Sequence, residues 1–156
     1  MAEKPVFLTP EGRDKLQLEL DHLVNVRRPE VADEIHSAKE EGDISENSAY
    51  DAAKETQAFV EGRIMALETM LKNAVMIDPA HSNGEVAMGC YVKVVERGSR
   101  DDEVYQIVGS AEADPSKGRI SNESPVGRAL MGKKKDEELS VKTPAGDRHL
   151  KVVEIW

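Results

Sequence analysis

The sequence is poor in cysteine and in aromatic residues, and both shortages exclude whole classes of protein. Cys90 is the single cysteine among 156 residues, so the chain can form neither an internal disulfide nor a cysteine-based zinc site. Cys90 stands in an apolar, strand-like pattern, which favours an inert thiol in a protein core. Aromatic residues make up 4% and charged residues 33% of the chain, so a long solvated helical surface is favoured over one large core.

A long apolar run and an excess of positive charge are also missing. No stretch approaches the ~20 apolar residues that a membrane-spanning helix needs, and no signal peptide is visible, so we expect a cytoplasmic protein without a membrane partner. The formal net charge is −9, whereas affinity for nucleic acid comes mainly from lysine and arginine on phosphates. Contact with nucleic acid would therefore require a metal ion or a protein partner.

The first half of the chain begins with a long helical pattern. Thr9 and Pro10 suit the N-cap and the first position of a helix, where the missing N–H of proline costs nothing. One stripe then recurs at steps of three and four residues, through Leu16, Leu20, Leu23, Arg27, Val31, Ile35 and Ala38. Pro29 should kink this helix near residues 25–28 without ending it, because the apolar spacing resumes in phase.

A second helical pattern forms a heptad seam through Ala53, Gln57, Val60, Ile64, Leu67, Leu71 and Ala74. Two seams of similar length joined by a short turn predict an antiparallel α-helical coiled-coil hairpin over residues 1–76, with its tip near residues 42–50. Each arm of roughly 30 residues would span about 45 Å. So long and thin a hairpin buries only a narrow stripe, which suits a probe that reaches into another molecule.

From residue 77 onward, Pro, Asn and Gly mark a boundary and β-branched residues become frequent. Strands are predicted at residues 86–95, 104–108, 139–143 and 149–155. One short helix is predicted at residues 124–132, because Ser124 suits its N-cap, Pro125 its first position and Gly132 its end. The predicted fold class is therefore α+β, with the hairpin followed by a small antiparallel β-sheet domain, residues 77–156, that carries one short helix.

The turn between the two arms is crowded with carboxylates. Between Glu30 and Glu55 there are nine acidic residues against Lys39 and Lys54, a balance of −7. Asp43, followed three residues later by Glu46, fits a capping box that starts the second helix, and spacing alone favours that role. The same two carboxylates are oxygen ligands of the kind that Mg²⁺ prefers. They supply only two of its six ligands, so such a site would need further ligands from outside these two residues.

The tip segment, residues 42–47 with the sequence Gly-Asp-Ile-Ser-Glu-Asn, resembles the signature of the Gre family of bacterial transcript cleavage factors. Tyr50 and residues 52–54 extend this resemblance. Further similar segments cover nearly the whole chain, at residues 27–30, 61–64, 107–109, 112–114, 120–121, 124–125 and 142–144.

The resemblance implies a hairpin that enters the secondary channel of bacterial RNA polymerase. It also implies an FKBP-like fold for the second domain, which would dock at the channel rim on the largest subunit. Asp43 and Glu46 would help to hold the polymerase's second catalytic Mg²⁺, which cuts the backtracked RNA at its 3′ end. The chain would then be a monomeric accessory factor, not an enzyme in its own right, and would not bind Mg²⁺ stably alone.

The resemblance also assigns roles outside the acidic pair. Near RNA it places Lys39 and Lys54, and at the polymerase rim it places Glu123, Ser124 and Pro125. Ser45 lies between the two acids in the sequence, where family members vary, and is a further RNA-proximal candidate because its hydroxyl can hydrogen-bond a phosphate or a water. Local roles stay open beside these, namely ion pairs for the two lysines and helix capping for the two serines. Tyr50 is expected to pack at the end of the hairpin.

Two other functions remain as alternatives. One is a non-catalytic binder of the same channel that inhibits or modulates the polymerase, but the paired Asp43 and Glu46 favour a cleavage factor. The other is a peptidyl-prolyl isomerase or chaperone, which only the FKBP-like domain suggests. Such an activity needs an aromatic pocket, and the second domain offers only Tyr91, Tyr105 and Trp156.

Overall fold

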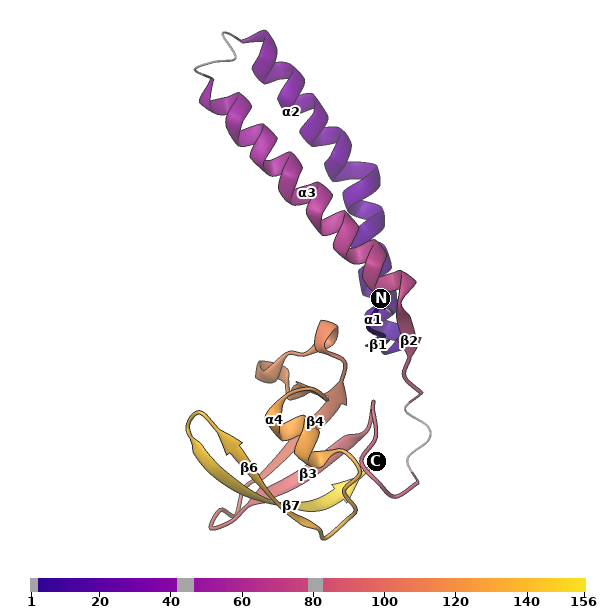
Figure 1. Ribbon diagram of the computed structural model, residues 1–156, viewed down its shortest axis with the longest axis vertical. Coiled ribbons are helices and arrows are strands. Elements are labelled where there is room, and N and C mark those ends of the chain that lie inside the picture. Colours follow the sequence, from indigo (N-terminus) through magenta and orange to yellow (C-terminus); the bar gives the residue numbers. More distant parts are fainter. Residues whose placement is uncertain (1–2, 42–46, 79–82) are drawn as a thin grey trace. The chain divides into compact units, whose positions relative to one another are not determined.

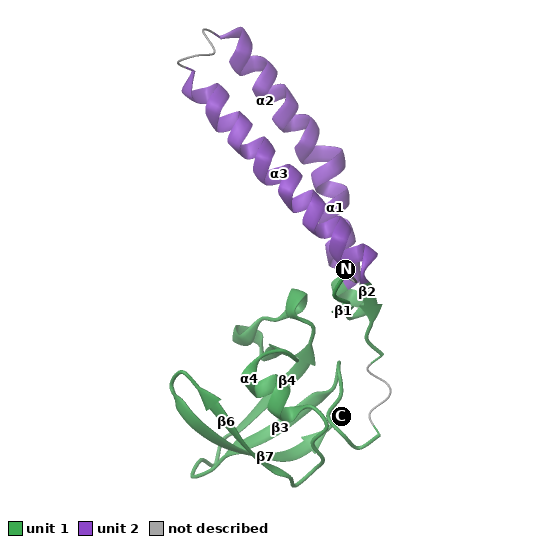
Figure 2. Ribbon diagram, in the orientation of Figure 1, with its two compact units in different colours: residues 1–12, 74–156 green, residues 13–73 purple. Residues whose placement is uncertain are grey.

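A computed structural model describes residues 3–41, 47–78 and 83–156. These residues form a mixed α+β fold that combines a long helical hairpin with a curled β-sheet (Figure 1). The chain divides into two compact units, coloured purple and green in Figure 2. We call residues 13–73 (purple) the first unit and residues 1–12 together with 74–156 (green) the second unit. None of the described helices is both long enough and apolar enough to span a membrane.

The first arm of the hairpin starts at the residue that the sequence predicts. Helix α1, Pro10–His22, is capped by Thr9, whose Oγ1 accepts a hydrogen bond of 3.1 Å from the Gly12 N–H. The arm continues through a π-helical turn, Leu23–Arg27, into helix α2, Arg28–Glu40. The prediction that the helix passes Pro29 is therefore confirmed. A π-helical turn stands where the sequence predicts a kink, and this wider turn accommodates a proline ring that would collide with the carbonyl four residues earlier.

The second arm is helix α3, Ser48–Lys72. The hairpin core combines buried residues from both predicted stripes, namely Val31, Ile35, Ala53, Val60 and Ile64. Two bidentate ion pairs join the arms outside this core. Arg28 binds Glu61 with N–O distances of 2.8 and 2.9 Å, and Arg63 binds Glu19 with distances of 2.6 and 2.9 Å. The Arg63 guanidinium lowers the pKa of Glu19 below its usual value, because it donates hydrogen bonds to the ionised carboxylate.

Two short strands that the sequence does not predict lie next to the hairpin in sequence. Strand β1, Val6–Leu8, pairs in parallel with strand β2, Ala74–Met76. Both strands belong to the unit that contains residues 83–156. This division differs from the predicted boundary between residues 76 and 77, because the ends of the hairpin segment pair with each other as strands instead of extending its helices.

The main sheet has five strands in the order β5-β4-β3-β7-β6. Four of them overlap the predicted strands: β3, Tyr91–Glu96; β4, Asp102–Val108; β6, Glu138–Thr143; and β7, Gly146–Ile155. The fifth, β5, Arg119–Ser121, was not predicted, and it pairs in parallel with β4. The prediction of a wholly antiparallel sheet is therefore wrong at this edge. Two short 3₁₀ turns, Ser110–Glu112 (η3) and Pro115–Lys117 (η4), lie between β4 and β5 and let the chain return in the same direction.

Helix α4, Pro125–Leu130, confirms the predicted short helix. The core beneath it is made of buried aliphatic residues from the sheet, from α4 and from the segment before β3: Val86, Val92, Val94, Ile107, Ile120, Leu130, Leu139, Val141, Leu150 and Val152. Cys90 is also buried, which confirms its predicted place in the core. Burial alternates with exposure along β3 and β7, so that Tyr91 and Lys151 are exposed between buried neighbours.

The segment before α1 packs against the turn that follows β4. Glu112 accepts hydrogen bonds from the Thr9 N–H at 2.7 Å and from Arg119 Nη2 at 2.9 Å. A Cβ atom built on Gly109 would lie 2.1 Å from the carbonyl oxygen of Phe7. This contact involves backbone on both sides, so neither partner can rotate away.

We expect Gly109→Ala to lower the free energy of unfolding by about 1–3 kcal/mol, because the added methyl group forces β1 away from the turn. Gly62→Ala is the matched control, since a Cβ atom there has no neighbour within 4 Å. That change lies inside α3 and should raise the stability of the hairpin by about 0.5–1 kcal/mol. Chemical denaturation followed by circular dichroism measures both effects. Equal effects of the two substitutions would contradict this account.

Candidate functional site

The candidate site is the end of the hairpin, where the sequence places its acidic pair. Asp43, Ser45 and Glu46 lie outside the described residues. Around them, α2 ends at Glu40 and α3 begins at Ser48. The described part of the candidate site therefore consists of the contacts between these two helix ends, which flank the acidic segment in the sequence.

Asn47 connects the two helix ends through its side-chain amide. Its Oδ1 accepts hydrogen bonds from the N–H groups of Ala49 at 3.0 Å and Tyr50 at 3.1 Å, which caps α3. Its Nδ2 donates to the carbonyl oxygen of Ala38 in the last turn of α2. A carboxylate could supply the acceptor but not the donor, so an amide is the side chain that fits both partners.

The spacing of Asp43 and Glu46 leaves open whether they cap the second helix, and the N-cap of α3 decides this point. Asn47 is the N-cap residue, and Ser48 is the first residue of the helix. The interpretation of Asp43 and Glu46 as the capping box of the second helix is therefore wrong. Helix α3 obtains its N-cap from Asn47, a residue nearer to its start.

The two lysines that flank the tip contact uncharged partners. Lys39 Nζ lies 6.0 Å from the centroid of the Tyr50 ring, a distance compatible with a cation–π contact. Tyr50 packs against the hairpin core, as the sequence predicts. Lys54 Nζ donates a hydrogen bond of 2.8 Å to Gln57 Oε1. Contact of either lysine with RNA stays a prediction.

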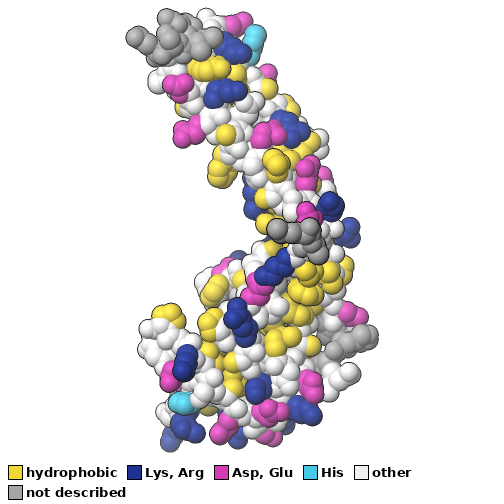
Figure 3. All heavy atoms as spheres, viewed as in Figure 1, with side chains coloured by type: hydrophobic (Ala, Val, Ile, Leu, Met, Phe, Trp, Pro, Cys, Tyr) yellow, Lys and Arg dark blue, Asp and Glu magenta, His cyan; other side chains and the backbone are white. Residues whose placement is uncertain are grey.

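A groove of about 640 Å³ lies between α2 and α3 near this end of the hairpin. Its α2 wall carries Glu30, Asp33, Glu34 and Glu41, and small residues such as Ala52 form its α3 wall. Acidic and basic side chains are mixed along the visible face of the hairpin (Figure 3). The groove thus adds described carboxylates to the negative charge that the sequence places around the tip.

The three residues predicted to contact the polymerase lie together at the start of α4. Ser124 Oγ accepts from the Gly127 N–H at 3.1 Å and donates to the Ser121 carbonyl at 2.7 Å, so its capping role is confirmed. Pro125, the first residue of the helix, is exposed. A docking role for this loop stays a prediction.

Glu123, in the same loop, has two partners that the sequence does not reveal. It forms an ion pair with Lys4 and accepts a hydrogen bond of 2.8 Å from Ser110 Oγ. Lys4 and then Ser110 lower the pKa of the Glu123 carboxylate, since both stabilise its charged form. These partners come from segments far away in the chain, so no local sequence signal indicates them.

Two family comparisons cover nearly the whole chain. Residues 6–76 match the family described as transcription elongation factor, N-terminal, and residues 81–156 match the family described as transcription elongation factor, GreA/GreB, C-terminal. The chain belongs to the GreA/GreB family of transcription elongation factors. Membership of the GreA/GreB family confirms the resemblance that the tip signature indicates.

Individual relatives agree with this membership. The chain is 51% identical over 156 residues to transcription elongation factor GreA of Bacillus subtilis (strain 168), and the aligned region covers 99% of each protein. It is 54% identical over 153 residues to GreA of Caldanaerobacter subterraneus subsp. tengcongensis, which covers 97% of this chain and 98% of the relative. The crystal structure of GreA factor homolog 1 (Gfh1) of Thermus thermophilus is 33% identical, with coverage of 98% and 99% and a TM-score of 0.45. The similarity to GreA proteins thus spans both units of this GreA/GreB-family chain.

No group of three or more His, Cys, Asp or Glu side chains suited to a metal ion occurs within residues 3–41, 47–78 and 83–156. The predicted metal ligands of this GreA/GreB-family chain, Asp43 and Glu46, lie outside those ranges.

Asn47 variants should separate the two functions of its amide. Asn47→Asp retains an acceptor for the Ala49 and Tyr50 N–H groups, but it replaces the donor to Ala38 by an oxygen that repels the carbonyl. Asn47→Ala removes both and should cost about 1–2 kcal/mol at the helix start. Amide hydrogen exchange should therefore show retained protection of Ala49 and Tyr50 in Asn47→Asp and lost protection in Asn47→Ala. Equal loss in the two variants would contradict the capping role of Oδ1.

Proposed function

We propose that this chain stimulates the Mg²⁺-dependent cleavage of backtracked RNA by bacterial RNA polymerase. The hairpin enters the secondary channel of the polymerase, and the second unit docks at the channel rim on the largest subunit. Membership of the GreA/GreB family supports the polymerase as partner. The observation that carries the proposal is that Asn47, within the signature segment, binds the end of α2 and the start of α3, the two helices that flank Asp43 and Glu46 in the sequence.

The proposed chemistry is that of a ligand donor. Mg²⁺ takes six oxygens at about 2.0–2.1 Å, and proteins usually provide one or two of them as carboxylates. Asp43 and Glu46 would provide two, and the polymerase, the RNA phosphate and water would provide the others. In two-metal hydrolysis the second ion stabilises the attacking or the leaving oxygen. The chain is thus an accessory factor that completes a metal site of the polymerase.

The proposal extends to the way in which the hairpin is built. We propose that α2 and α3 form an antiparallel coiled coil and that the second unit has an FKBP-like fold. Support for the coiled coil comes from the burial of Val31 and Ile35 opposite Val60 and Ile64, with the spacing of a heptad seam. The same proposal places Lys39, Ser45 and Lys54 near RNA, since they surround the acidic pair in the sequence.

Substitution of the acidic pair tests the metal-ligand role. We expect Asp43→Ala or Glu46→Ala to reduce stimulated cleavage by about 100-fold or more, because each removes one oxygen ligand of the ion. Binding to the polymerase should remain nearly unchanged. Cleavage of end-labelled RNA in a halted, backtracked complex measures the activity, and competition with the unmodified chain measures the binding.

Two further variants distinguish a ligand from a general charge effect. Glu55→Ala removes an exposed carboxylate near the tip and should leave cleavage unchanged. Asp43→Asn retains the shape of the side chain, and a higher Mg²⁺ concentration should partly restore its activity. Parallel loss of binding and cleavage in Asp43→Ala would contradict the metal-ligand role. A chain that binds the polymerase without stimulating any cleavage would instead support the non-catalytic alternative.

The loop before α4 tests the docking surface. Glu123→Lys should weaken binding to the polymerase by about tenfold, because the substitution reverses a charge that the partner surface would have to match. Lys4→Ala is the control, since it removes the internal partner of Glu123 and keeps the carboxylate. This control should bind at least as well as the unmodified chain. Unchanged competition by Glu123→Lys, with an unchanged circular dichroism spectrum, would move the docking surface elsewhere.

A further inference from the structure

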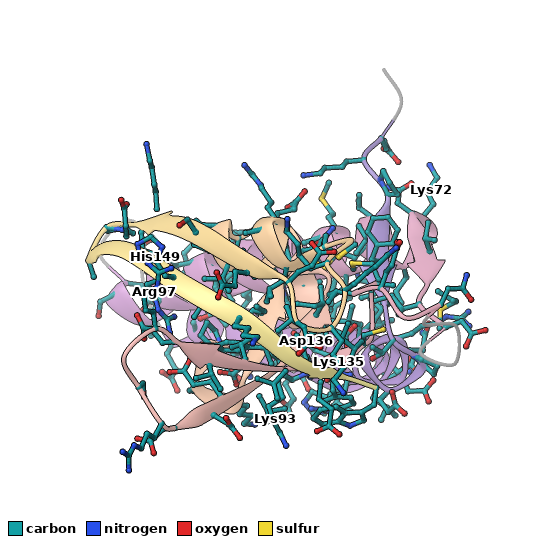
Figure 4. All side chains as sticks on the ribbon, turned by 90° about the horizontal axis from the view of Figure 1, so that it is seen from below. Lys72, Lys93, Arg97, Lys135, Asp136 and His149 are labelled. Atoms are coloured by element: carbon teal, nitrogen blue, oxygen red, sulfur yellow. The ribbon has the colours of Figure 1, made fainter. Side chains whose placement is uncertain are left out.

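A pocket of about 340 Å³ lies on the exposed face of the sheet, between the turn after β3 and the paired strands β6 and β7. Gly98, with φ of +85°, allows this turn to fold back, and the Ser99 N–H donates to the Glu96 carbonyl at 3.0 Å. The Arg97 N–H donates to the His149 carbonyl at 2.9 Å, which holds the turn against β7. Figure 4 shows Arg97 and His149 beside each other at this end of the sheet. The pocket therefore has a hydrogen-bonded frame.

Two cationic side chains of the pocket have no partner in the part of the chain that the structure describes. Arg97 and Lys151 both line the pocket, and neither side chain forms a hydrogen bond or an ion pair there. The neighbouring arginine differs, because Arg148 binds Glu96 at 3.3 Å and Glu103 at 3.1 Å. Arg148 is shared between these two carboxylates and offsets only part of the charge of Glu96. Arg97 and Lys151 remain available to an external anion.

Neutral donors also line the pocket. Ser140 Oγ and His149 Nδ1 are 2.6 Å apart on the neighbouring strands β6 and β7. When the serine hydroxyl donates to Nδ1, the proton of the neutral imidazole resides on Nε2, which is then a donor. Ser99 Oγ accepts from the Asp101 N–H at 3.1 Å, so its hydroxyl proton is free to be donated. The pocket thus combines two cations with two uncharged donors.

Apolar and acidic groups limit the ligand further. Val95 pairs with Lys151 in the sheet and lines the pocket with the polar groups, whereas the side chains of Leu139 and Leu150 belong to the core. The ligand therefore has a small apolar portion. Glu138 also lines the pocket and stands opposite Lys151 in the β6–β7 register. Its carboxylate opposes the binding of an anion and reduces the net charge of the unpaired groups to about +1. Glu96, which shares Arg148 with Glu103, lowers the charge of the pocket further.

We propose that this pocket binds a small phosphate monoester that carries an apolar or aromatic body. Arg97 offers a planar fork of donors that suits phosphate oxygens, and Lys151 adds a point charge. A phosphate monoester carries about −1.5 to −2 charges and three terminal oxygens, which use both cations and the neutral donors together. A carboxylate has two oxygens, and the guanidinium of Arg97 alone satisfies them. The site lies in the second unit and is independent of the function proposed for the hairpin tip.

Phenyl phosphate is the probe for this site, titrated into the ¹⁵N-labelled full-length chain. Saturable changes of amide chemical shift are expected at residues 97–99, 138–140 and 149–151, and none in α3. Arg97→Ala should weaken binding by about tenfold or more, because one of the two cations is lost. Arg100→Ala is the matched control, since this exposed arginine lies in the same turn and does not line the pocket.

Two further variants test whether each charged side chain favours or opposes the binding of phenyl phosphate. Lys151→Ala should weaken binding, and Glu138→Gln should strengthen it about twofold to fivefold by removing a repulsive charge. Benzoate should bind at least about tenfold more weakly than phenyl phosphate if the phosphate oxygens use all four donors. Equal affinities of the two probes would overturn the phosphate assignment. Shifts that do not saturate, or equal effects of Arg97→Ala and Arg100→Ala, would overturn the site itself.

Discussion

The position of the N-terminal segment depends on the hydrogen bonds that the carboxylate of Glu112 accepts. It accepts hydrogen bonds from the N–H and the hydroxyl group of Thr9 and from Arg119, while only 6% of the Glu112 side chain is exposed. Because Thr9 also caps α1, the same carboxylate stabilises the start of the helix. Gly12 permits this approach, since a Cβ atom there would lie 2.1 Å from Glu112 Cδ. Loss of one donor would leave a poorly hydrated charge less well compensated, which costs more than an ordinary hydrogen bond.

The two arms of the hairpin are held together by a different set of contacts. Its core is narrow, so the arms rely on a single buried stripe and on the ion pairs Arg28–Glu61 and Arg63–Glu19. At its end, Asn47 performs two tasks with one amide, because it caps α3 and binds the last turn of α2. Because Asn47 is the N-cap of α3, the neighbouring carboxylates do not occupy that position. A negatively charged end of this kind repels RNA until a cation intervenes, which agrees with the role proposed above.

In the second unit, some charged side chains are paired within the fold, whereas others have no partner among the described residues. Glu96 and Glu103 are bound by Arg148, and Glu123 is bound by Lys4. The pKa of Glu103 is lowered, first by a hydrogen bond from Tyr105 and further by Arg148, so its contribution to stability is present at neutral pH and declines as the pH falls through this lowered value. Around the sheet pocket, by contrast, Arg97 and Lys151 are unpaired among the described residues. Ligand binding is expected where charges are left over, because charges already paired would have to be separated first.

The sequence by itself determined the features that depend on near neighbours. Thr9 and Pro10 start α1, Ser124 and Pro125 start α4, and the apolar stripes of both arms form the hairpin core, because helix caps and helix periodicity involve residues within four positions of each other. Only the tertiary structure establishes the parallel pairing of β1 with β2 and of β5 with β4. It also supplies the partners of Glu112 and Glu123 and the pocket at Arg97. These features join segments that are distant in the chain, and strands of three residues are too short to show a period. Their positions therefore follow from the path of the whole chain and not from local preference.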